Sequence, residues 1–215
     1  MALSSLWRRI GKPAVQLRSA AAVLVLLVSA SGVGTLFWYM DWIYSLPTDV
    51  PKDYNSVETG SLMDLGDNPD SVSGKPMFLN FFNPRCACSR FNVPAIKALV
   101  ADYGGRVSFS VVAMLPDDDD QYTEQDIQRM LGEEVPVSFD RSKATACGVY
   151  STPQAVLIDA EGRLFYRGNY NKARYCSAEA TNYARMAIEA LLGGNAGLDF
   201  AALPSYGCSL PTCVK

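Results

Sequence analysis

The sequence predicts an α/β sandwich that follows one N-terminal membrane-spanning helix. Two observations carry this prediction. An uncharged apolar run covers residues 20–40, behind a basic N-terminus. Beyond that run, apolar strand candidates alternate with helix candidates and end in a hairpin and a last helix, an order typical of an α/β sandwich. The 215 residues suffice for one globular domain with accessory segments.

The first 45 residues predict a membrane anchor. Residues 1–19 form a basic cytoplasmic segment, and residues 20–45 combine the apolar span with an aromatic belt at its end. About 20 apolar residues cross a bilayer, and basic flanks stay in the cytoplasm. We therefore expect a single-pass protein of the bacterial inner membrane, with its domain in the periplasm. The alternative is a signal peptide cut near Ser29-Ala30-Ser31, but apolar and aromatic residues continue past that point, which favours an uncleaved anchor.

Composition excludes several classes of function. All 22 acidic residues lie after position 40, and the chain contains no histidine. An acidic domain argues against nucleic acid as a partner. Without histidine there are no His-based metal sites and no Cys–His or Ser–His catalytic pairs. We therefore predict no cofactor and no metal site. Calcium at Asp117–Asp120 is a weaker interpretation than a solvated loop.

Beyond the anchor, the chain divides into three parts. Residues 46–74 are rich in turn formers and predict a linker, of which the part near residues 57–65 is a candidate for packing on the domain. Residues 75–196 form the folded domain. Residues 197–215 form a tail that contains cysteines.

Each element of the domain has a local signal in apolar pattern, turn residues or helix caps. The expected strands are Met77–Phe82, Val107–Met114, Val135–Phe139, Gln154–Asp159 and Arg163–Gly168, the last two forming a hairpin. The expected helices are Cys86–Tyr103 with a kink at Pro94, Thr123–Leu131 with Thr123 as N-cap, a short turn at Thr145–Gly148, and Ala178–Leu192.

The junction between the first strand and the first helix is the first candidate for chemistry. Cys86 and Cys88 lie there. Free backbone N–H groups and the positive end of the helix dipole stabilise a thiolate at such a position. Arg85 and Arg90 add positive charge nearby. The thiolate is the nucleophile in disulfide exchange, so this junction predicts a redox site.

Two motifs resemble the thioredoxin fold, of the redoxin and membrane-tethered thioredoxin-like kind. One is the segment Phe82-Asn83-Pro84-Arg85-Cys86, with Pro94 eight residues after the cysteine. The other is the passage at residues 148–162, which contains Ser151-Thr152-Pro153. The resemblance covers about residues 75–194 and implies a thioredoxin-like three-layer sandwich. It also implies that Cys86 is the nucleophile and that Pro153, preceded by Thr152, is cis and faces it.

The sequence departs from this family in several places. Ser89 stands at the position of the resolving cysteine, so the site reads Cys-Ala-Cys-Ser with an additional Cys88. Arg85 replaces the usual aromatic residue before the nucleophile. Asn80 stands where many thioredoxins keep a buried acid. Asn83 stands where peroxiredoxins need Thr or Ser, which weakens a peroxidase interpretation.

Several thiols are candidates for resolving a mixed disulfide on Cys86. Cys88 would close a small, strained ring. Alternatively, Ser89 leaves the mixed disulfide long-lived until a second thiol, for which Cys147 is a candidate, resolves it. A structural Cys147–Cys176 disulfide is an equally weighted role for Cys147.

The tail carries Cys208 and Cys213. The favoured interpretation is a local Cys208–Cys213 disulfide that fixes the tail (a structural staple). The alternative is that either thiol reacts with Cys86 or with a partner. Six cysteines allow fifteen connectivities, and the sequence alone does not choose among them.

The predicted function is that of a membrane-anchored thiol–disulfide oxidoreductase. Its partners would be cysteine-containing exported proteins or a redox partner protein. One alternative is a copper-handling thioredoxin-like protein that binds Cu(I) at Cys86 and Cys88, although such proteins typically also use a histidine. Another is a non-catalytic thioredoxin-fold binding module. The state of Cys86 separates the three: an exchanging thiol, a metal ligand or an inert disulfide.

Overall fold

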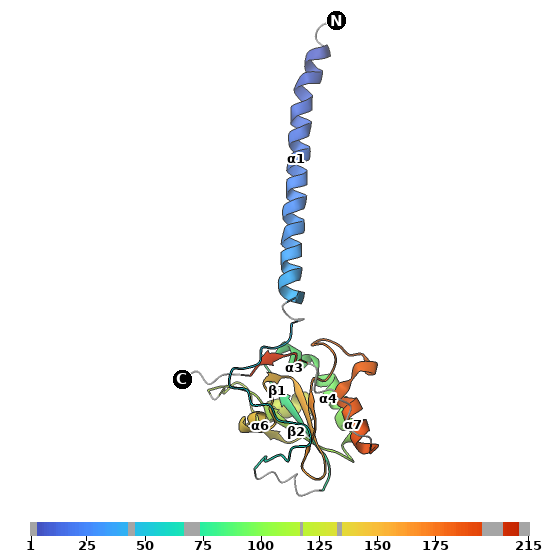
Figure 1. Cartoon of the computed structure of the whole chain (residues 1–215). Helices are drawn as coiled ribbons and strands as arrows, with labels where there is room; N and C mark the ends of the chain where they lie inside the picture. Colours follow the sequence, from blue (N-terminus) through green and yellow to red (C-terminus); the bar gives the residue numbers. More distant parts are fainter. Residues whose placement is uncertain are drawn as a thin grey trace. The chain divides into compact units, whose positions relative to one another are not determined.

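The structure is a computed structural model that describes residues 4–42, 46–66, 74–116, 118–132, 135–194 and 204–210 (Figure 1). It forms two compact units, residues 1–46 and residues 47–215. Parts of the predicted linker (residues 67–73) and of the predicted tail (residues 197–203 and 211–215), together with Asp117, lie outside the described residues.

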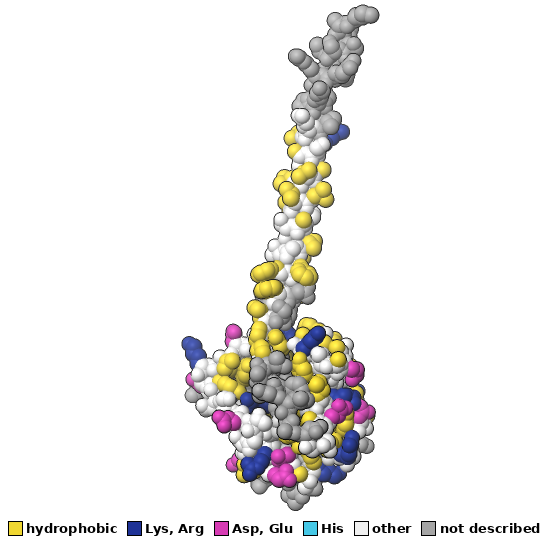
Figure 2. Space-filling model, turned by 45° about the vertical axis from the view of Figure 1, so that its right-hand side comes forward, with side chains coloured by type: hydrophobic (Ala, Val, Ile, Leu, Met, Phe, Trp, Pro, Cys, Tyr) yellow, Lys and Arg dark blue, Asp and Glu magenta, His cyan; other side chains and the backbone are white. Residues whose placement is uncertain are grey.

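The first unit, in its described residues 4–42, is one long helix. Helix α1 (Ser4–Phe37) continues into a π-helical turn, Trp38–Trp42, in which the two tryptophan rings stack with centroids 4.8 Å apart. The 25 residues Gln16–Met40 are long and apolar enough to cross a membrane. At about 1.5 Å per residue they extend roughly 37 Å, against about 30 Å for a hydrocarbon core. Apolar side chains are exposed along this helix (yellow in Figure 2).

A five-stranded mixed sheet forms the centre of the second unit. Its strand order is β3-β2-β1-β5-β6, with β1, β2 and β3 parallel and β5 and β6 antiparallel. The strands are β1 (Met77–Phe82), β2 (Ser108–Ala113), β3 (Val137–Ser138), β5 (Gln154–Ile158) and β6 (Leu164–Gly168). All residues of β1 are buried, as expected for a central strand that is covered on both faces.

Two hydrophobic layers cover the sheet. Alternation along β1 sends Phe78 and Phe82 to one core and Leu79 and Phe81 to the other. The first core includes side chains of α4 (Val93–Tyr103), α5 (Glu124–Leu131) and α7 (Tyr183–Leu192). The second includes side chains of α6 (Ser142–Ala146). The predicted α/β sandwich is therefore confirmed, with helices on both faces of the sheet (Figure 1).

Most predicted elements are present, with shifted ends. The prediction of Thr123 as an N-cap is confirmed, because its hydroxyl accepts from the Asp126 N–H while the Asp126 carboxylate accepts from the Thr123 N–H. The short turn begins earlier than predicted, as α6. The last helix begins later, at Tyr183, where the Asn182 side chain caps it after a 3-10 turn at Glu179–Thr181.

The helix predicted as Cys86–Tyr103 is two helices. Helix α3 (Ala87–Phe91) ends at Asn92, and α4 begins at Val93. Pro94 lies in the first turn of α4, where its missing N–H costs nothing, whereas inside one continuous helix it would remove a hydrogen bond. The Asn92 side chain donates to the Cys88 carbonyl at 2.9 Å across the break.

Part of the segment before β1 packs on the domain. Val57, Met63 and Leu65 lie against the second core, and Leu62 forms an isolated bridge with Arg163. Thr48, further upstream, is buried. The packing near residues 57–65 agrees with the sequence-based expectation, whereas the burial of Thr48 was not predicted.

A second, small sheet joins the tail to the domain. Strands β4 (Ser151–Thr152) and β7 (Cys208–Ser209) pair antiparallel, with Thr152 opposite Cys208. Neither strand has a local signal in the sequence, and neither was predicted. This pairing places the tail beside the loop that contains Pro153.

Candidate active site

Cys86 lies at the start of α3, directly after the turn that follows β1. Its backbone is extended (φ −78°, ψ 122°), and its side chain is only 4% exposed. The turn is held by Ser89, which is fully buried and whose hydroxyl accepts from the Asn83 N–H at 3.3 Å. Ser89 therefore stabilises the turn that positions Cys86.

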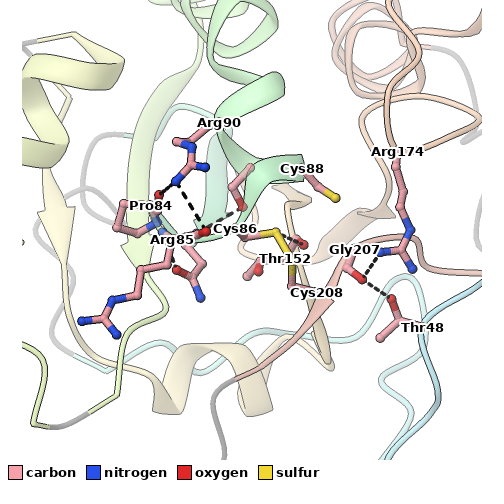
Figure 3. The surroundings of a disulfide bond; sticks show 12 residues. Thr48, Pro84, Arg85, Cys86, Cys88, Arg90, Thr152, Arg174, Gly207 and Cys208 are labelled. Carbon is pink, nitrogen blue, oxygen red and sulfur yellow. Dashed lines mark hydrogen bonds between the residues drawn. A yellow bond between two sulfur atoms is a disulfide. The ribbon is translucent and has the colours of Figure 1, made fainter. Parts of the chain in front are cut away.

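Cys86 forms a disulfide with Cys208 of the tail (Figure 3). The Cα atoms are 6.3 Å apart, and 122 positions separate the two residues in sequence. The favoured Cys208–Cys213 staple is therefore wrong for this state, and Cys213 lies outside the described residues. The β4–β7 pairing explains why Cys208 bonds to Cys86. Thr152 lies opposite Cys208 in that pair, and the Thr152 carbonyl oxygen lies 3.7 Å from Cys86 Sγ.

Two side chains hold the tail at Gly207, the residue before Cys208. The Thr48 hydroxyl donates to the Gly207 carbonyl at 2.9 Å, and Arg174 Nη1 donates to the same oxygen at 2.7 Å (Figure 3). A Cβ atom on Gly207 would collide with the carbonyl group of Thr152. Glycine therefore permits the close approach of the two strands.

Further hydrogen bonds hold the tail just upstream. Asn169 accepts from the Tyr206 N–H and donates to the Pro204 carbonyl, both at 2.9 Å. The Gln154 side chain donates to the Ser205 hydroxyl, and the Thr48 N–H donates to the Ser205 carbonyl at 2.8 Å. The tail is thus bound through its backbone and side chains as well as through its sulfur.

The Thr152–Pro153 peptide bond is cis, which confirms the expectation from the resemblance. Both Ser151 and Thr152 are fully buried. The contact between the Thr152 carbonyl and Cys86 Sγ places this loop against the predicted nucleophile.

Cys88 carries a free, buried thiol beside the disulfide. The Sγ atoms of Cys86, Cys88 and Cys208 all lie within 4.8 Å of one another. Cys88 Sγ also lies 3.6 Å from the Tyr175 hydroxyl, which accepts its hydrogen bond. The structure therefore brings together the two sequence-predicted thiols and one thiol of the tail.

Cys147 and Cys176 are not bonded to each other, so the predicted bridge between them is absent here. Cys147 is fully buried in the second core, where loss of solvation raises the pKa of its thiol to about 12 despite the positive charges of Arg167 and Lys143. It does not belong to the three-sulfur cluster. These features argue against Cys147 as a resolving thiol.

Arg85 does not act on the cysteines in the way its sequence position suggests. Its guanidinium forms an ion pair with Asp119 at 2.8 Å and donates to Gln121 at 3.0 Å, pointing away from the disulfide (Figure 3). Arg90 instead donates to the Pro84 carbonyl at 2.9 Å, which stabilises the turn before Cys86. An acidic loop thus draws Arg85 away from the thiols.

Asn80 makes a buried, neutral hydrogen bond in the centre of the sheet. The Tyr170 hydroxyl donates to Asn80 Oδ1 at 2.8 Å, and both residues are buried. Burial raises the pKa of Tyr170 well above its ordinary value. This pair stays neutral over the physiological pH range and offers no proton acceptor to the cysteines.

Sequence reasoning missed the residues that seat the tail, above all Thr48 and Arg174. The Gly207-Cys208-Ser209 sequence was the one available signal, because glycine before a cysteine permits close backbone approach. The partners of that glycine come from segments far away in the chain and have no motif of their own.

Fold and site together define a thioredoxin-like protein whose first cysteine is bonded to a tail strand. The chain belongs to the family described as a domain of unknown function, DUF6436, whose model matches residues 61–209. The match therefore includes the tail cysteine Cys208 as well as Cys86 and Cys88.

Several solved structures are similar. A hypothetical protein of Sinorhizobium meliloti has a TM-score of 0.59 and 25% identity, over 75% of this chain and 98% of that chain. An uncharacterized conserved protein of Geobacillus kaustophilus has a TM-score of 0.60 and 22% identity, over 78% of this chain and 100% of that chain. A thioredoxin family thiol:disulfide interchange protein of Chlorobium tepidum has a TM-score of 0.45 and 18% identity, over 64% of this chain and 99% of that chain. No curated protein matches the sequence.

Proposed function

We propose that this protein is a membrane-anchored thiol–disulfide oxidoreductase, with Cys86 as the nucleophile and Cys208 as the resolving thiol. One observation carries the proposal: the Cys86–Cys208 disulfide lies against the cis Thr152–Pro153 loop, with a third thiol within 4.8 Å. The Cys208 sulfur meets the Cys86 sulfur beside the strand–helix junction, which is the proximity that exchange requires.

The reaction begins with both thiols reduced. The Cys86 thiolate attacks one sulfur of a partner disulfide, forms a mixed disulfide and releases the other partner sulfur as a thiolate. Cys208 then attacks Cys86 Sγ, the Cys86–Cys208 bond forms, and the second partner sulfur leaves as a thiolate that takes up a proton. Two electrons pass from the protein to the partner, and the reverse sequence oxidises a partner dithiol.

Cys88 supplies a second route for resolution. Its free thiol lies within 4.8 Å of both sulfurs of the disulfide. Attack by the Cys88 thiolate on Cys86 Sγ would form a Cys86–Cys88 disulfide and release Cys208 as a thiolate that takes up a proton, which opens the link to the tail. In the proposal Cys208 is the principal resolving thiol, because it is the one bonded to Cys86.

The helical segment Gln16–Met40 supports a single-pass anchor. Its basic N-terminal flank favours a cytoplasmic N-terminus, so the cysteines would face the bacterial periplasm. Disulfides persist in that compartment, and its exported proteins carry cysteines. The substrates in this proposal are therefore cysteine-containing exported proteins or a dedicated redox partner.

Trapping of mixed disulfides tests the proposal. Full-length Cys208→Ser and Cys88→Ser/Cys208→Ser variants would be expressed in membranes, quenched with acid, alkylated and separated without reductant. We expect the amount of partner adduct to increase from wild type to the single variant and again to the double variant, because each change removes a resolving thiol. Cys176→Ser, which alters a free thiol outside the cluster, is the matched control.

Adding Cys86→Ser to the double variant should abolish every adduct. Adducts that persist without Cys86, or a Cys208→Ser variant that traps no more partner than Cys176→Ser, would show that Cys86 and Cys208 do not perform the exchange. The non-catalytic binding module would then be the better account.

A further inference from the structure

The cluster contains three cysteine sulfurs, one more than disulfide exchange between Cys86 and Cys208 needs. Cys86 and Cys88 lie at the start of α3, and Cys208 lies on β7, so two separate elements supply the sulfurs of the cluster (Figure 3). Their Sγ atoms lie within 4.8 Å of one another. Exchange through Cys86 and Cys208 would not require the third thiol to be there.

We propose that reduction of the Cys86–Cys208 disulfide turns this cluster into a site for one Cu(I) ion held by three thiolates. A cation that lies about 2.3 Å from each of three sulfurs in one plane separates those sulfurs by roughly 4 Å. That separation fits within the observed limit of 4.8 Å. After reduction, the Cys86 and Cys208 sulfurs need only separate from a bonded distance to the roughly 4 Å that the ion requires.

The donor set selects the ion. Thiolates are soft ligands that favour Cu(I), Zn(II) and iron–sulfur clusters. Structural zinc takes four ligands, but among the described residues the cluster contains three cysteines and no carboxylate, and the chain has no histidine. Three sulfur ligands and no harder donor suit Cu(I).

The surroundings suit such a site. Cys86 is 4% exposed and Cys88 is 1% exposed, so the protein shields two of the three ligands from water. A Cu(I) ion with three thiolates carries a net charge of −2. Arg174, which donates to the carbonyl of Gly207 next to Cys208, brings positive charge to the tail side of the cluster.

The binding step balances without a change in the oxidation state of copper. A thiol or phosphine reductant first supplies two electrons, and two protons are taken up, to convert the disulfide into the Cys86 and Cys208 thiols. The three thiols then lose three protons to the solvent as Cu(I) binds. Disulfide formation and copper binding use the same sulfurs, so the oxidised protein cannot form the three-thiolate site.

The test uses full-length protein in detergent micelles. The protein would first be reduced with a phosphine, and the phosphine would then be removed under anaerobic conditions. The reduced protein would compete for Cu(I) against a chromophoric chelator. We expect one Cu(I) per chain, and X-ray absorption at the copper edge should show three sulfur neighbours and no nitrogen. Cys88→Ser and Cys208→Ser should each weaken binding by more than about 100-fold. Cys176→Ser and Cys213→Ser should bind as wild type does.

The oxidised wild-type protein is a control with no change in sequence. Because its Cys86 and Cys208 sulfurs are bonded, it should lose the tight site while keeping its fold. Unchanged binding in Cys208→Ser would reduce the site to two sulfurs and overturn the proposal, as would tight binding by the oxidised protein or loss of binding in Cys213→Ser. A failure here leaves mixed-disulfide trapping unaffected, so it is separable from a failure of the proposed exchange.

Discussion

Cys86 and Cys208 lie 122 positions apart in sequence, and a disulfide joins them at a Cα–Cα distance of 6.3 Å. The bond ties the start of α3 to a two-residue strand of the tail, directly beside the cis Thr152–Pro153 loop. The tail therefore occupies the surface next to the predicted nucleophile, and a redox change at Cys86 is also a change in how the tail is held.

Gly207→Ala should loosen the tail. The new methyl group would collide with the Thr152 carbonyl, so the hydrogen bonds that Thr48 and Arg174 donate to Gly207 would be lost. Two hydrogen bonds at about 1 kcal/mol each correspond to a roughly 30-fold shift of the Cys86–Cys208 equilibrium toward the dithiol. Equilibration with glutathione buffers measures this shift. Gly105→Ala, at a position with no atoms within 4 Å, is the control; equal values for both variants would refute the role of Gly207.

Reduction of the disulfide should destabilise the domain. The bond closes a loop of more than a hundred residues, and such cross-links stabilise by about 2–4 kcal/mol, chiefly by restricting the unfolded chain. Urea unfolding of the full chain in detergent, followed by circular dichroism, should give a lower unfolding free energy for the reduced protein. Cys208→Ala should match the reduced wild type, whereas Cys176→Ala should keep the full difference between the two redox states. Equal stability of both states would contradict this prediction.

The Asn80–Tyr170 hydrogen bond should contribute to stability. Asn80→Ala leaves the buried Tyr170 hydroxyl without its acceptor, which costs about 1–3 kcal/mol. Tyr170→Phe removes the donor, so the double variant should lose less than the sum of the two single losses. A double-mutant cycle by urea unfolding measures the coupling, and strict additivity would show that this hydrogen bond contributes nothing.

Elements that depend on neighbouring residues in the chain were predictable, and those that depend on contacts between distant segments were not. The strands β1, β2, β5 and β6 have local apolar patterns, and the α5 cap has a local Thr–Asp pair, so all were predicted. The pairing of β4 with β7 joins two-residue segments that are far apart in the chain, and no local pattern encodes it. For the same reason the sequence favoured a bridge between Cys208 and the nearby Cys213.

Arg85 shows a second limit of the sequence. Its place next to Cys86 suggested support for a thiolate, but the ion pair with Asp119 depends on a loop more than thirty residues away. Thr48 shows the converse, because it lies in the segment predicted to be a linker and yet holds the tail. Chemistry that lies on one short stretch was predictable, and chemistry assembled from distant segments was not.

Cys147 should resist alkylation in the native protein. Its pKa is raised to about 12 by burial, against 9.0 for an unperturbed thiol. A thiol whose pKa is raised on folding stabilises the fold below the unfolded pKa, and this contribution is lost as pH rises from about 9 toward 12. At pH 8 its thiolate fraction is about a thousandfold lower than that of an unperturbed thiol. Timed iodoacetamide labelling with peptide mass spectrometry should therefore show Cys176 modified well before Cys147, and early labelling of Cys147 would refute its burial.

The most direct test of the proposed exchange is a redox titration of the full-length protein in glutathione buffers, with each cysteine read by differential alkylation and peptide mass spectrometry. We expect Cys86 and Cys208 to become protected together in one two-electron transition and to appear as a linked peptide, while Cys147 and Cys176 stay free. A Cys208–Cys213 linkage with Cys86 free, or a Cys86 that stays locked at every potential, would contradict it.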